Sequence, residues 1–167
     1  MKKIAVFIGD ISGEFQVDVL GAIRKAARAR GIGVFVYANA AVYGSNIFYS
    51  HGEKNIINMP YLEDYDGIIV AGDTFGIDDM DEEVAQLLKR EAKCPVVCIR
   101  QKDERFSNVV VDDYTAMCTI VEHFIVHHGF KRVCFMTGKL EMYDAQRRAT
   151  TASADFSVRS ISISSYA

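Results

Sequence analysis

Four aspartates and one arginine lie at or just beyond the ends of short apolar runs, where side chains could do chemistry. They are Asp10, Asp73, Asp112, Asp113 and Arg100. Carboxylates at such positions can hold magnesium, act as general bases, accept hydrogen bonds from sugar hydroxyls or cap helices. For Asp112 and Asp113, helix capping is the expected role, because a helical pattern begins directly after them.

The motifs for nucleotide binding and nucleophilic catalysis are incomplete in this sequence. Gly31-Ile32-Gly33 follows a helical pattern and lacks the third glycine of a dinucleotide fingerprint. Thr137-Gly138-Lys139 lacks the earlier glycine of a phosphate-binding loop, and Leu140 stands where that loop needs serine or threonine. Ser12 lacks the flanking glycines of a nucleophile elbow. We therefore expect no cofactor and no acyl-transfer chemistry.

Histidine and cysteine spacing offers little support for a metal site. His123 and His127 are one helical turn apart and could grip an ion, but no third ligand follows at a fixed offset. Phe124 stands where a zinc protease needs glutamate. The four cysteines, Cys94, Cys98, Cys118 and Cys134, form no C-x-x-C pair. We expect them to be small buried hydrophobic residues and expect no metal.

Apolar periodicity predicts strands that alternate with helices. Strands are expected at 3–8, 34–38, 55–58, 67–71, 96–99, 108–111 and 133–137, and helices at 14–30, 46–52, 81–92 and 113–128. Asp79 and Glu82 are spaced like a capping box. This order predicts an α/β fold with a doubly wound parallel sheet, in which Ile4–Ile8, apolar on both faces, is an internal strand. Ligands bind beyond the carboxyl ends of such strands, so Asp10 and Arg100 should share one edge.

Length and charge limit the classes of function. The chain has 167 residues and a formal net charge of −3, which suits one domain or two small lobes and disfavours direct nucleic-acid binding. No apolar run approaches the roughly 20 residues of a membrane span. The first apolar run is too short for a signal peptide, so we expect a cytoplasmic protein.

Five segments carry a more specific pattern. They are 4–15, 65–70 (Tyr-Asp-Gly-Ile-Ile-Val), 94–97 (Cys-Pro-Val-Val), 109–138 and 145–148 (Ala-Gln-Arg-Arg). Taken in order, they resemble the effector-binding module of the lactose/galactose repressor family, which has a type I periplasmic-binding-protein fold. The segment 109–138 carries the most specific part of the resemblance.

The resemblance implies a first lobe over 1–111, a hinge crossing and the start of a second lobe over 112–148, and an atypical tail over 149–167. A small effector, commonly a sugar or a purine-like molecule, would bind between the lobes. By position, the ligand contacts of the family fall on Asp10, Phe15, Gln16, Gly72, Asp73, Arg100 and Arg148. Phe15 could stack on an apolar ligand face, while Asp10, Asp73 and Arg100 could make charge-assisted hydrogen bonds.

Departures from the family pattern shape further expectations. No helix-turn-helix precedes Met1, Phe130 replaces the usual histidine after Gly129, and Ala149-Thr150-Thr151 breaks the pattern after Arg148. We therefore expect a module without a DNA-binding headpiece and with an incomplete second lobe. The segment Tyr43–Pro60 resembles sensor domains that precede diguanylate cyclase domains in some bacteria.

An incomplete second lobe would leave apolar residues bare. They are Met117, Ile120, Val121, Phe124, Ile125, Val133 and Phe135. Residues 156–163 alternate like a strand, but a phase slip at Arg159–Ser160 would turn half of their apolar side chains away from any one face. We therefore expect that a second copy of the chain, and not the tail, covers this surface in a homodimer.

The expected function is a non-catalytic module that senses a sugar or nucleoside-like effector within a bacterial regulatory or signalling protein. Its partners would be the effector and a second copy of the chain, with no direct nucleic-acid or membrane contact. The alternative is a small metal-dependent α/β enzyme that uses the acidic residues at the strand ends. Against it, turnover needs placed acid, base or metal groups, and the sequence shows no such spacing.

Overall fold

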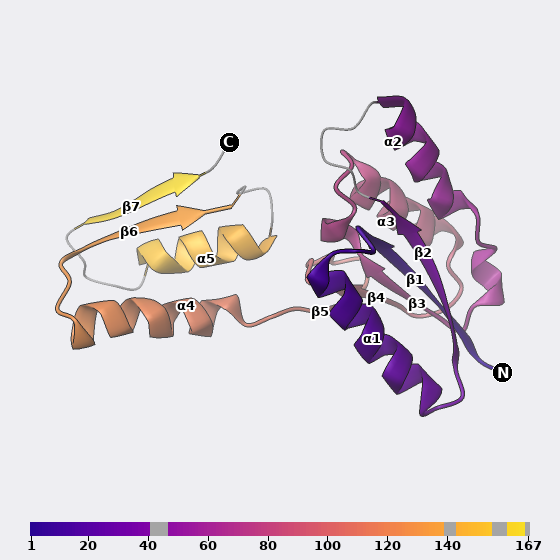
Figure 1. Ribbon diagram of the computed structural model, residues 1–167, viewed down its shortest axis with the longest axis horizontal. Coiled ribbons are helices and arrows are strands. Elements are labelled where there is room, and N and C mark those ends of the chain that lie inside the picture. Colours follow the sequence, from indigo (N-terminus) through magenta and orange to yellow (C-terminus); the bar gives the residue numbers. More distant parts are fainter. Residues whose placement is uncertain (41–46, 139–142, 155–159, 166–167) are drawn as a thin grey trace. The chain divides into compact units, whose positions relative to one another are not determined.

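The computed structural model describes residues 1–40, 47–138, 143–154 and 160–165 (Figure 1). The chain divides into two compact units, Met1–Val109 and Val110–Ala167. The first unit contains a five-stranded sheet and the second a two-stranded sheet. Among the described helices, none has the length and apolar character that crossing a lipid bilayer requires.

The sheet of the first unit is entirely parallel, with strand order β2-β1-β3-β4-β5. Its strands are β1 (Lys3–Gly9), β2 (Gly33–Asn39), β3 (Gly67–Ala71), β4 (Val96–Ile99) and β5 (Ser107–Val109). The prediction that Ile4–Ile8 forms an internal strand is confirmed, since β1 pairs with both β2 and β3. Every residue from Ala5 to Ile8 is at most 1% exposed, as expected for a strand covered on both faces.

Helices cover both faces of this sheet, which confirms the predicted doubly wound α/β architecture. Figure 1 shows α1 (Glu14–Arg28) in front of the sheet and α3 (Met80–Glu91) behind it. Successive side chains of β1 point to opposite faces. Ala5 and Phe7 therefore join the core cluster that contains residues of α3, whereas Val6 and Ile8 join the cluster that contains residues of α1.

Two local predictions in this unit are wrong. The strand expected at 55–58 is a 3-10 helix, η1 (Asn55–Asn58), which follows α2 (Ile47–Lys54); only Ile57 of its four residues is buried. The capping box before α3 does not form, because Asp79 has a left-handed backbone (φ 62°) and its side chain makes no capping hydrogen bond. N-cap residues normally have extended backbone angles, which aim the side chain at the first turn.

The second unit begins with the predicted helix after Asp112. It comprises α4 (Asp113–Glu122), a wider helical turn η4 (His123–His127), β6 (Arg132–Thr137), α5 (Tyr143–Ala154) and β7 (Ser160–Ser165). The Asp112 side chain accepts a hydrogen bond from the Thr115 amide at 3.1 Å, so the expected cap is confirmed for Asp112. Hydrogen bonding from the side chain and the amide of Thr115 lowers the pKa of the Asp112 carboxyl below its usual value.

The apolar residues of α4 are less bare than expected. Met117 and Val121 are buried, and Ile125 and Phe135 pack against them. In contrast, Ile120 is 50% exposed. Two faces of one helix therefore differ: one is covered within the unit and the other is open.

The expectation that the tail would not pack onto this unit is wrong for Ser160–Ser165. These residues form β7, which pairs in parallel register with β6 from Arg132↔Ser160 to Thr137↔Ser165. The phase slip does not prevent pairing, because β7 begins at Ser160, just beyond Arg159. Backbone hydrogen bonds hold β7 beside β6. The strand therefore does not need all apolar side chains of 156–163 to lie on one face. The rest of the predicted segment, 156–159, lies outside the described residues.

Candidate functional site

A hydrogen bond joins the end of β1 to the turn that follows β3. The Gly9 amide donates a 2.7 Å hydrogen bond to Thr74 Oγ1, and that hydroxyl donates to the Ala71 carbonyl at 2.6 Å. The backbones approach so closely that a Cβ on Gly9 would lie 2.1 Å from the Thr74 carbonyl oxygen. Glycine is therefore required at position 9, and η3 (Gly72–Thr74) holds Asp73 beside the start of the β1–α1 turn.

The turn between β1 and α1 places Asp10 and Gln16 around Gly13. Asp10 donates its amide to the Asn39 carbonyl at 3.0 Å and accepts from the Gly13 amide at 2.8 Å. A Cβ on Gly13 would lie 2.3 Å from Gln16 Oε1 and 3.0 Å from Asp10 Oδ2. Ser12 Oγ donates to Asp10 Oδ1 at 3.2 Å. Two predicted contact residues thus face the same small space.

Arg100, Asp73 and Phe15 form the centre of the site. Arg100 Nε lies 2.9 Å from Asp73 Oδ2, and the Arg100 guanidinium carbon lies 4.4 Å from the centre of the Phe15 ring. The Arg100 side chain is 31% exposed and the Asp73 side chain 14%. The three residues come from the ends of β4 and β3 and from the first turn of α1. They present a cation, a carboxylate and an aromatic ring at one edge of the sheet.

Gly72 leaves room for the residue that follows Arg100. A Cβ on Gly72 would lie 2.4 Å from Gln101 Oε1 and 3.2 Å from Asp81 Cβ. Gln101 Nε2 in turn donates to Asp81 Oδ2 at 3.3 Å. The segment after β4 therefore packs against both η3 and the first turn of α3.

Two of the predicted contact residues have unusual backbone angles. Asp10 has φ 47° and Arg100 has φ 66°, and Asp79 is the third non-glycine residue with positive φ among those described. Positive φ costs L-residues other than glycine roughly 1 kcal/mol or more, and such residues concentrate at functional sites. Both strands thus turn sharply where they end, and this aims their next side chains along the sheet edge.

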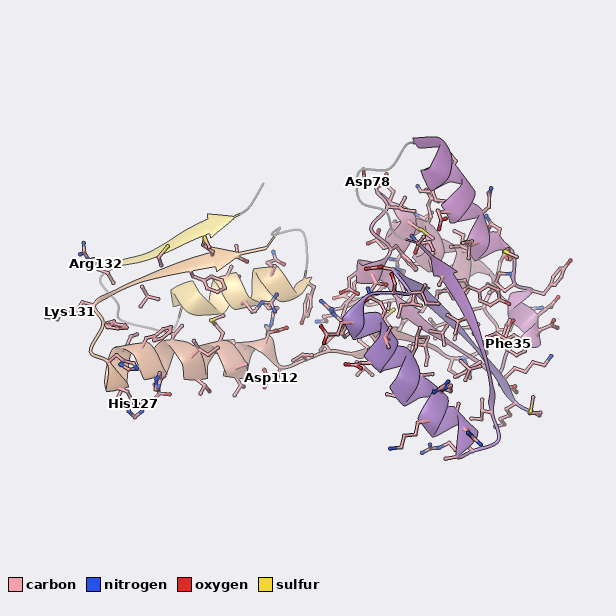
Figure 2. All side chains as sticks on the ribbon, in the orientation of Figure 1. Phe35, Asp78, Asp112, His127, Lys131 and Arg132 are labelled. Carbon is pink, nitrogen blue, oxygen red and sulfur yellow. The ribbon has the colours of Figure 1, made fainter. Side chains whose placement is uncertain are left out.

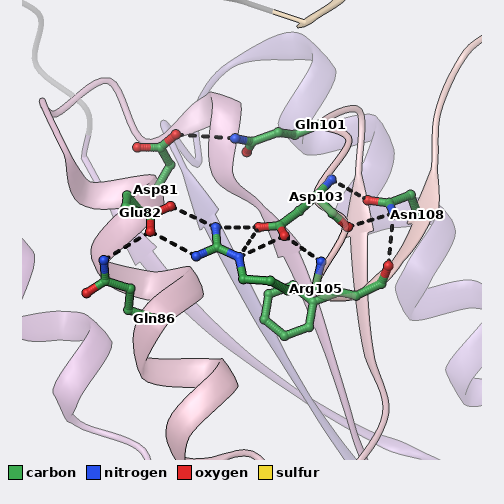
Figure 3. Close-up of polar contacts among 8 residues, drawn as sticks. Asp81, Glu82, Gln86, Gln101, Asp103, Arg105 and Asn108 are labelled. Carbon is green, nitrogen blue, oxygen red and sulfur yellow. Dashed lines mark hydrogen bonds and ion pairs between the residues drawn. The ribbon is translucent and has the colours of Figure 1, made fainter.

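A dense ion-pair network next to this site was not predicted from the sequence (Figure 3). Arg105 donates to both carboxylate oxygens of Glu82, at 2.8 and 2.7 Å, and also to Asp103. The Arg105 hydrogen bonds lower the pKa of Asp103 and bring the pKa of Glu82 to about 2. Charge alone does not reveal this pairing, because Arg105 and Glu82 are far apart in sequence and meet through the loop conformation.

The remaining predicted contact, Arg148, lies in the second unit. Its Nη1 atom is 3.4 Å from Asp113 Oδ1, which joins α5 to the start of α4. Asp10, Phe15, Gln16, Gly72, Asp73 and Arg100 all lie in the first unit. The structure therefore gathers six of the seven predicted residues at one edge of one sheet.

In the second unit His123 lies next to both other histidines of its helical segment, and its ring centre is 5.1 Å from that of His127, the neighbour that the spacing predicts. The wider turn η4 brings His128 to His123, with their Nε2 atoms 3.1 Å apart. Figure 2 shows His127 near the end of this helix, on the side away from β6 and β7. Among the described residues, no three histidine, cysteine, aspartate or glutamate side chains are grouped closely enough to hold a metal ion.

The cysteines follow the prediction only in part. Cys98 is buried and Cys94 and Cys118 are half-buried, but Cys134 is exposed. Burial raises the pKa of the Cys98 thiol to about 11, which keeps it protonated and unreactive at neutral pH. Cys134 differs because it lies on β6, whose residues alternate between exposed and more buried positions.

Comparisons with known proteins place the fold. Neither a protein-family model nor a curated protein matches this sequence. Among solved structures, an ABC sugar transporter subunit from Rhodobacter sphaeroides is similar over 98% of this chain, with a TM-score of 0.73 and 15% sequence identity. A LacI transcriptional regulator from Lactobacillus brevis is similar over 99% of this chain, with a TM-score of 0.68 and 20% identity.

A third similar structure contains a bound sugar. It is an ABC transporter periplasmic solute-binding protein from Actinobacillus succinogenes with bound D-allose, similar over 99% of this chain with a TM-score of 0.69 and 16% identity. The chain spans only 55–58% of the length of these three proteins. The expected resemblance is confirmed at the level of fold: this chain has a type I periplasmic-binding-protein-like fold and corresponds to part of the domain that those proteins contain.

Proposed function

We propose that this chain is part of a module that binds a sugar or a nucleoside-like effector reversibly and does no chemistry on it. The observation that carries the proposal is the grouping of Arg100, Asp73 and Phe15 at the carboxyl edge of the sheet. In open α/β sheets this edge is where ligands bind. The bound sugar in one similar structure, and the sugar transport function of another, support the choice of ligand class.

The chemistry of the three side chains suits a neutral polyhydroxyl ligand. Sugars carry vicinal hydroxyls that both donate and accept hydrogen bonds, and one face of the ring is often apolar. Guanidinium N–H groups donate, the carboxylate of Asp73 accepts, and such charge-assisted hydrogen bonds are roughly twice as strong as neutral ones. The Phe15 ring offers an apolar face for a sugar or base to stack on.

The metal-dependent enzyme has less support. Asp73, one of its proposed acidic groups, is engaged with Arg100 at 2.9 Å, and Asp112 caps α4. Asp113 pairs with Arg148 at 3.4 Å, so three of the four acidic residues at strand ends have structural partners that account for their positions. We propose binding without turnover as the function of this edge.

We also propose that the module belongs to a cytoplasmic regulatory or signalling protein and acts as a homodimer. The LacI regulator among the similar structures supports a regulatory setting. The net charge of −3 argues against direct contact of this chain with nucleic acid. The output to which ligand binding is coupled would reside in other parts of the protein.

Thermal unfolding in the presence of a small-molecule panel tests the binding proposal. The panel contains pentoses, hexoses, nucleosides and, separately, magnesium chloride at millimolar concentration. A sugar or nucleoside should raise the melting temperature of the wild-type chain, and Asp73→Asn should abolish that rise. The matched control Asp64→Asn, in the 3-10 helix η2 (Leu62–Asp64) before β3, should keep it. A rise with magnesium alone would favour the enzyme, and no rise with any organic ligand would contradict the proposal.

A further inference from the structure

We infer that Arg105 is a positioning residue for Arg100: it ties the loop between β4 and β5 to α3 and so fixes the guanidinium group that lies at the candidate site. The inference rests on the proposed function only for its consequence in ligand binding. The positioning itself can be measured without any ligand.

The loop that carries Arg100 needs external support. Arg100 donates its amide to the Val109 carbonyl at 2.8 Å, which keeps its backbone at the end of the β4–β5 ladder. Its left-handed backbone (φ 66°) then directs the chain into a loop that runs to β5 at Ser107. Phe106, near the far end of this loop, packs against the core of the unit. Loop residues without such contacts are the most mobile parts of a fold, so the residues between Arg100 and Phe106 depend on polar contacts for their order.

Arg105 supplies the contact to α3 (Figure 3). Its two terminal nitrogens donate to the two carboxylate oxygens of Glu82, at 2.8 and 2.7 Å, in the parallel geometry that arginine makes best with carboxylates. Glu82 also accepts from Gln86 Nε2 at 3.0 Å, one turn further along α3. The Arg105 side chain is 27% exposed and the Glu82 side chain 52%, so the ion pair lies at the surface with the arginine partly covered.

The same guanidinium group closes the loop on itself. Arg105 Nε donates to Asp103 Oδ1 at 2.8 Å and Nη2 donates to Asp103 Oδ2 at 2.7 Å. Asn108 completes the closure: its Nδ2 donates to the carbonyls of Asp103 and Phe106, at 2.8 and 2.9 Å, and its Oδ1 accepts from the Asp103 amide at 2.8 Å. The loop is thus a closed hydrogen-bonded unit, and the Arg105–Glu82 ion pair attaches it to α3.

Gln101 connects this unit to the candidate site. It donates to Asp81, the neighbour of Glu82 on α3, and its side chain fills the space that Gly72 leaves open. Arg100 directly precedes Gln101 in the sequence, and Asp73 directly follows Gly72. When Arg105 holds the loop on α3, Gln101 stays against Gly72 and the Arg100 side chain stays within reach of Asp73 and Phe15.

The test measures the order of the Arg100 side chain directly. In wild-type protein the Arg100 Nε atom lies 2.9 Å from Asp73 Oδ2, so the exchange of its N–H proton with water, followed by ¹⁵N NMR of arginine side chains, should be slow. Arg105→Gln should speed that exchange roughly tenfold, because the loop then opens more often. Glu82→Gln, which removes the same attachment from the α3 side, should do the same.

Controls separate positioning from a general loss of stability. Arg90→Gln removes another arginine of the first unit, one that pairs with Glu91 on the surface, and should leave the Arg100 exchange rate unchanged. Hydrogen exchange of the β1 amides should stay at wild-type rates in Arg105→Gln, which shows that the core is intact. Unchanged Arg100 exchange in both Arg105→Gln and Glu82→Gln would overturn the inference, as would faster exchange throughout the unit.

A binding measurement then distinguishes this inference from the proposed function. If D-allose or another sugar of the panel binds the wild-type chain, Arg105→Gln should weaken it, and adding Arg105→Gln to Arg100→Ala should cause no further loss. If the exchange result holds but no panel member binds, the positioning role stands and the proposed function fails. If a sugar binds and Arg100 stays ordered without Arg105, the proposed function stands and the positioning role fails.

Discussion

The Arg100 guanidinium carbon, at the end of β4, lies 4.4 Å from the centre of the Phe15 ring, in the first turn of α1. Cation–π contact at this distance stabilises both side chains modestly, by roughly 0.5–1 kcal/mol at partly exposed sites. The same guanidinium group meets Asp73 at 2.9 Å, so its orientation is fixed from two sides. A ligand that enters here meets a preorganised surface and loses little side-chain entropy on binding.

Arg100→Ala should weaken ligand binding strongly and leave folding nearly unchanged. The side chain is 31% exposed, and a partly exposed ion pair contributes roughly 0–1 kcal/mol to stability. Isothermal titration with the best sugar of the panel should show at least a roughly tenfold loss of affinity, the effect of about 1.4 kcal/mol. Arg90→Ala serves as the matched control, and survival of binding in Arg100→Ala would show that Arg100 is not a contact.

Gly9→Ala should destabilise the first unit strongly. The new Cβ would lie 2.1 Å from the Thr74 carbonyl oxygen and 2.5 Å from the Phe75 Cα atom, both on backbone that cannot rotate away. Overpacking of this kind costs roughly 1–3 kcal/mol, measured as the free energy of unfolding in urea.

Gly21→Ala is the matched control for that substitution. Gly21 lies within α1 and a Cβ there would meet nothing within 4 Å. Alanine should therefore stabilise the helix by roughly 0.5–1 kcal/mol. Equal effects of the two substitutions would contradict the close approach of η3 to the end of β1.

The Arg105–Glu82 attachment predicts a specific response to acid. The folded-state pKa of Glu82 is about 2, against an ordinary value of 4.5. A lowered folded pKa means that this carboxylate contributes stability above pH 4.5, and that the contribution is lost as pH falls from 4.5 toward 2. Urea unfolding across that range should show a smaller pH dependence in Glu82→Gln than in wild type.

Arg105→Gln should reduce the same pH dependence, because Arg105 is the main cause of the lowered pKa values of Glu82 and Asp103. The folded state lowers the pKa of both carboxyls, so both contribute folding stability that is lost as the pH falls, and the two contributions add. A wild-type pH profile in both variants would show that the ion pairs do not persist in solution.

The second unit should self-associate at micromolar concentration. Its exposed apolar side chains include Ile120, Val126, Phe130 and Met136, at 50%, 67%, 51% and 66% exposure. Apolar surface of this extent favours association between copies. Sedimentation velocity should show a dimer that Val126→Glu weakens, whereas Met59→Lys, at an exposed apolar site of the first unit, should not. A monomer at all concentrations would contradict the homodimer.

The sequence predicted most reliably where one physical cause dominates. The run Ile4–Ile8 is apolar at every position, which only a strand buried on both faces explains, and β1 is such a strand. Because parallel strands end at one edge, the positions of Asp10, Asp73 and Arg100 followed from the strand pattern. The resemblance added Phe15, whose ring no spacing argument had connected to Arg100.

The failures arise where local pattern competes with tertiary contacts. Asn55–Asn58 contains two isoleucines, which favour a strand. Only Ile57 is buried, and a short 3-10 helix is enough to bury it. Glu82 matched a capping box, but Arg105 offers two charged hydrogen bonds in place of one backbone contact. Neither outcome can be derived from residues close in sequence, since each depends on a partner brought near by the fold.

The left-handed backbone at Asp10 and Arg100 makes selection for folding stability and selection for ligand binding favour different residues at these positions. Glycine at either position would relieve the positive φ and so raise the folding stability of the chain. It would also delete a carboxylate or a guanidinium group from the sheet edge. A variant library sorted for heat resistance alone should therefore accumulate glycine or asparagine at positions 10 and 100, while a library sorted for ligand retention should keep aspartate and arginine there.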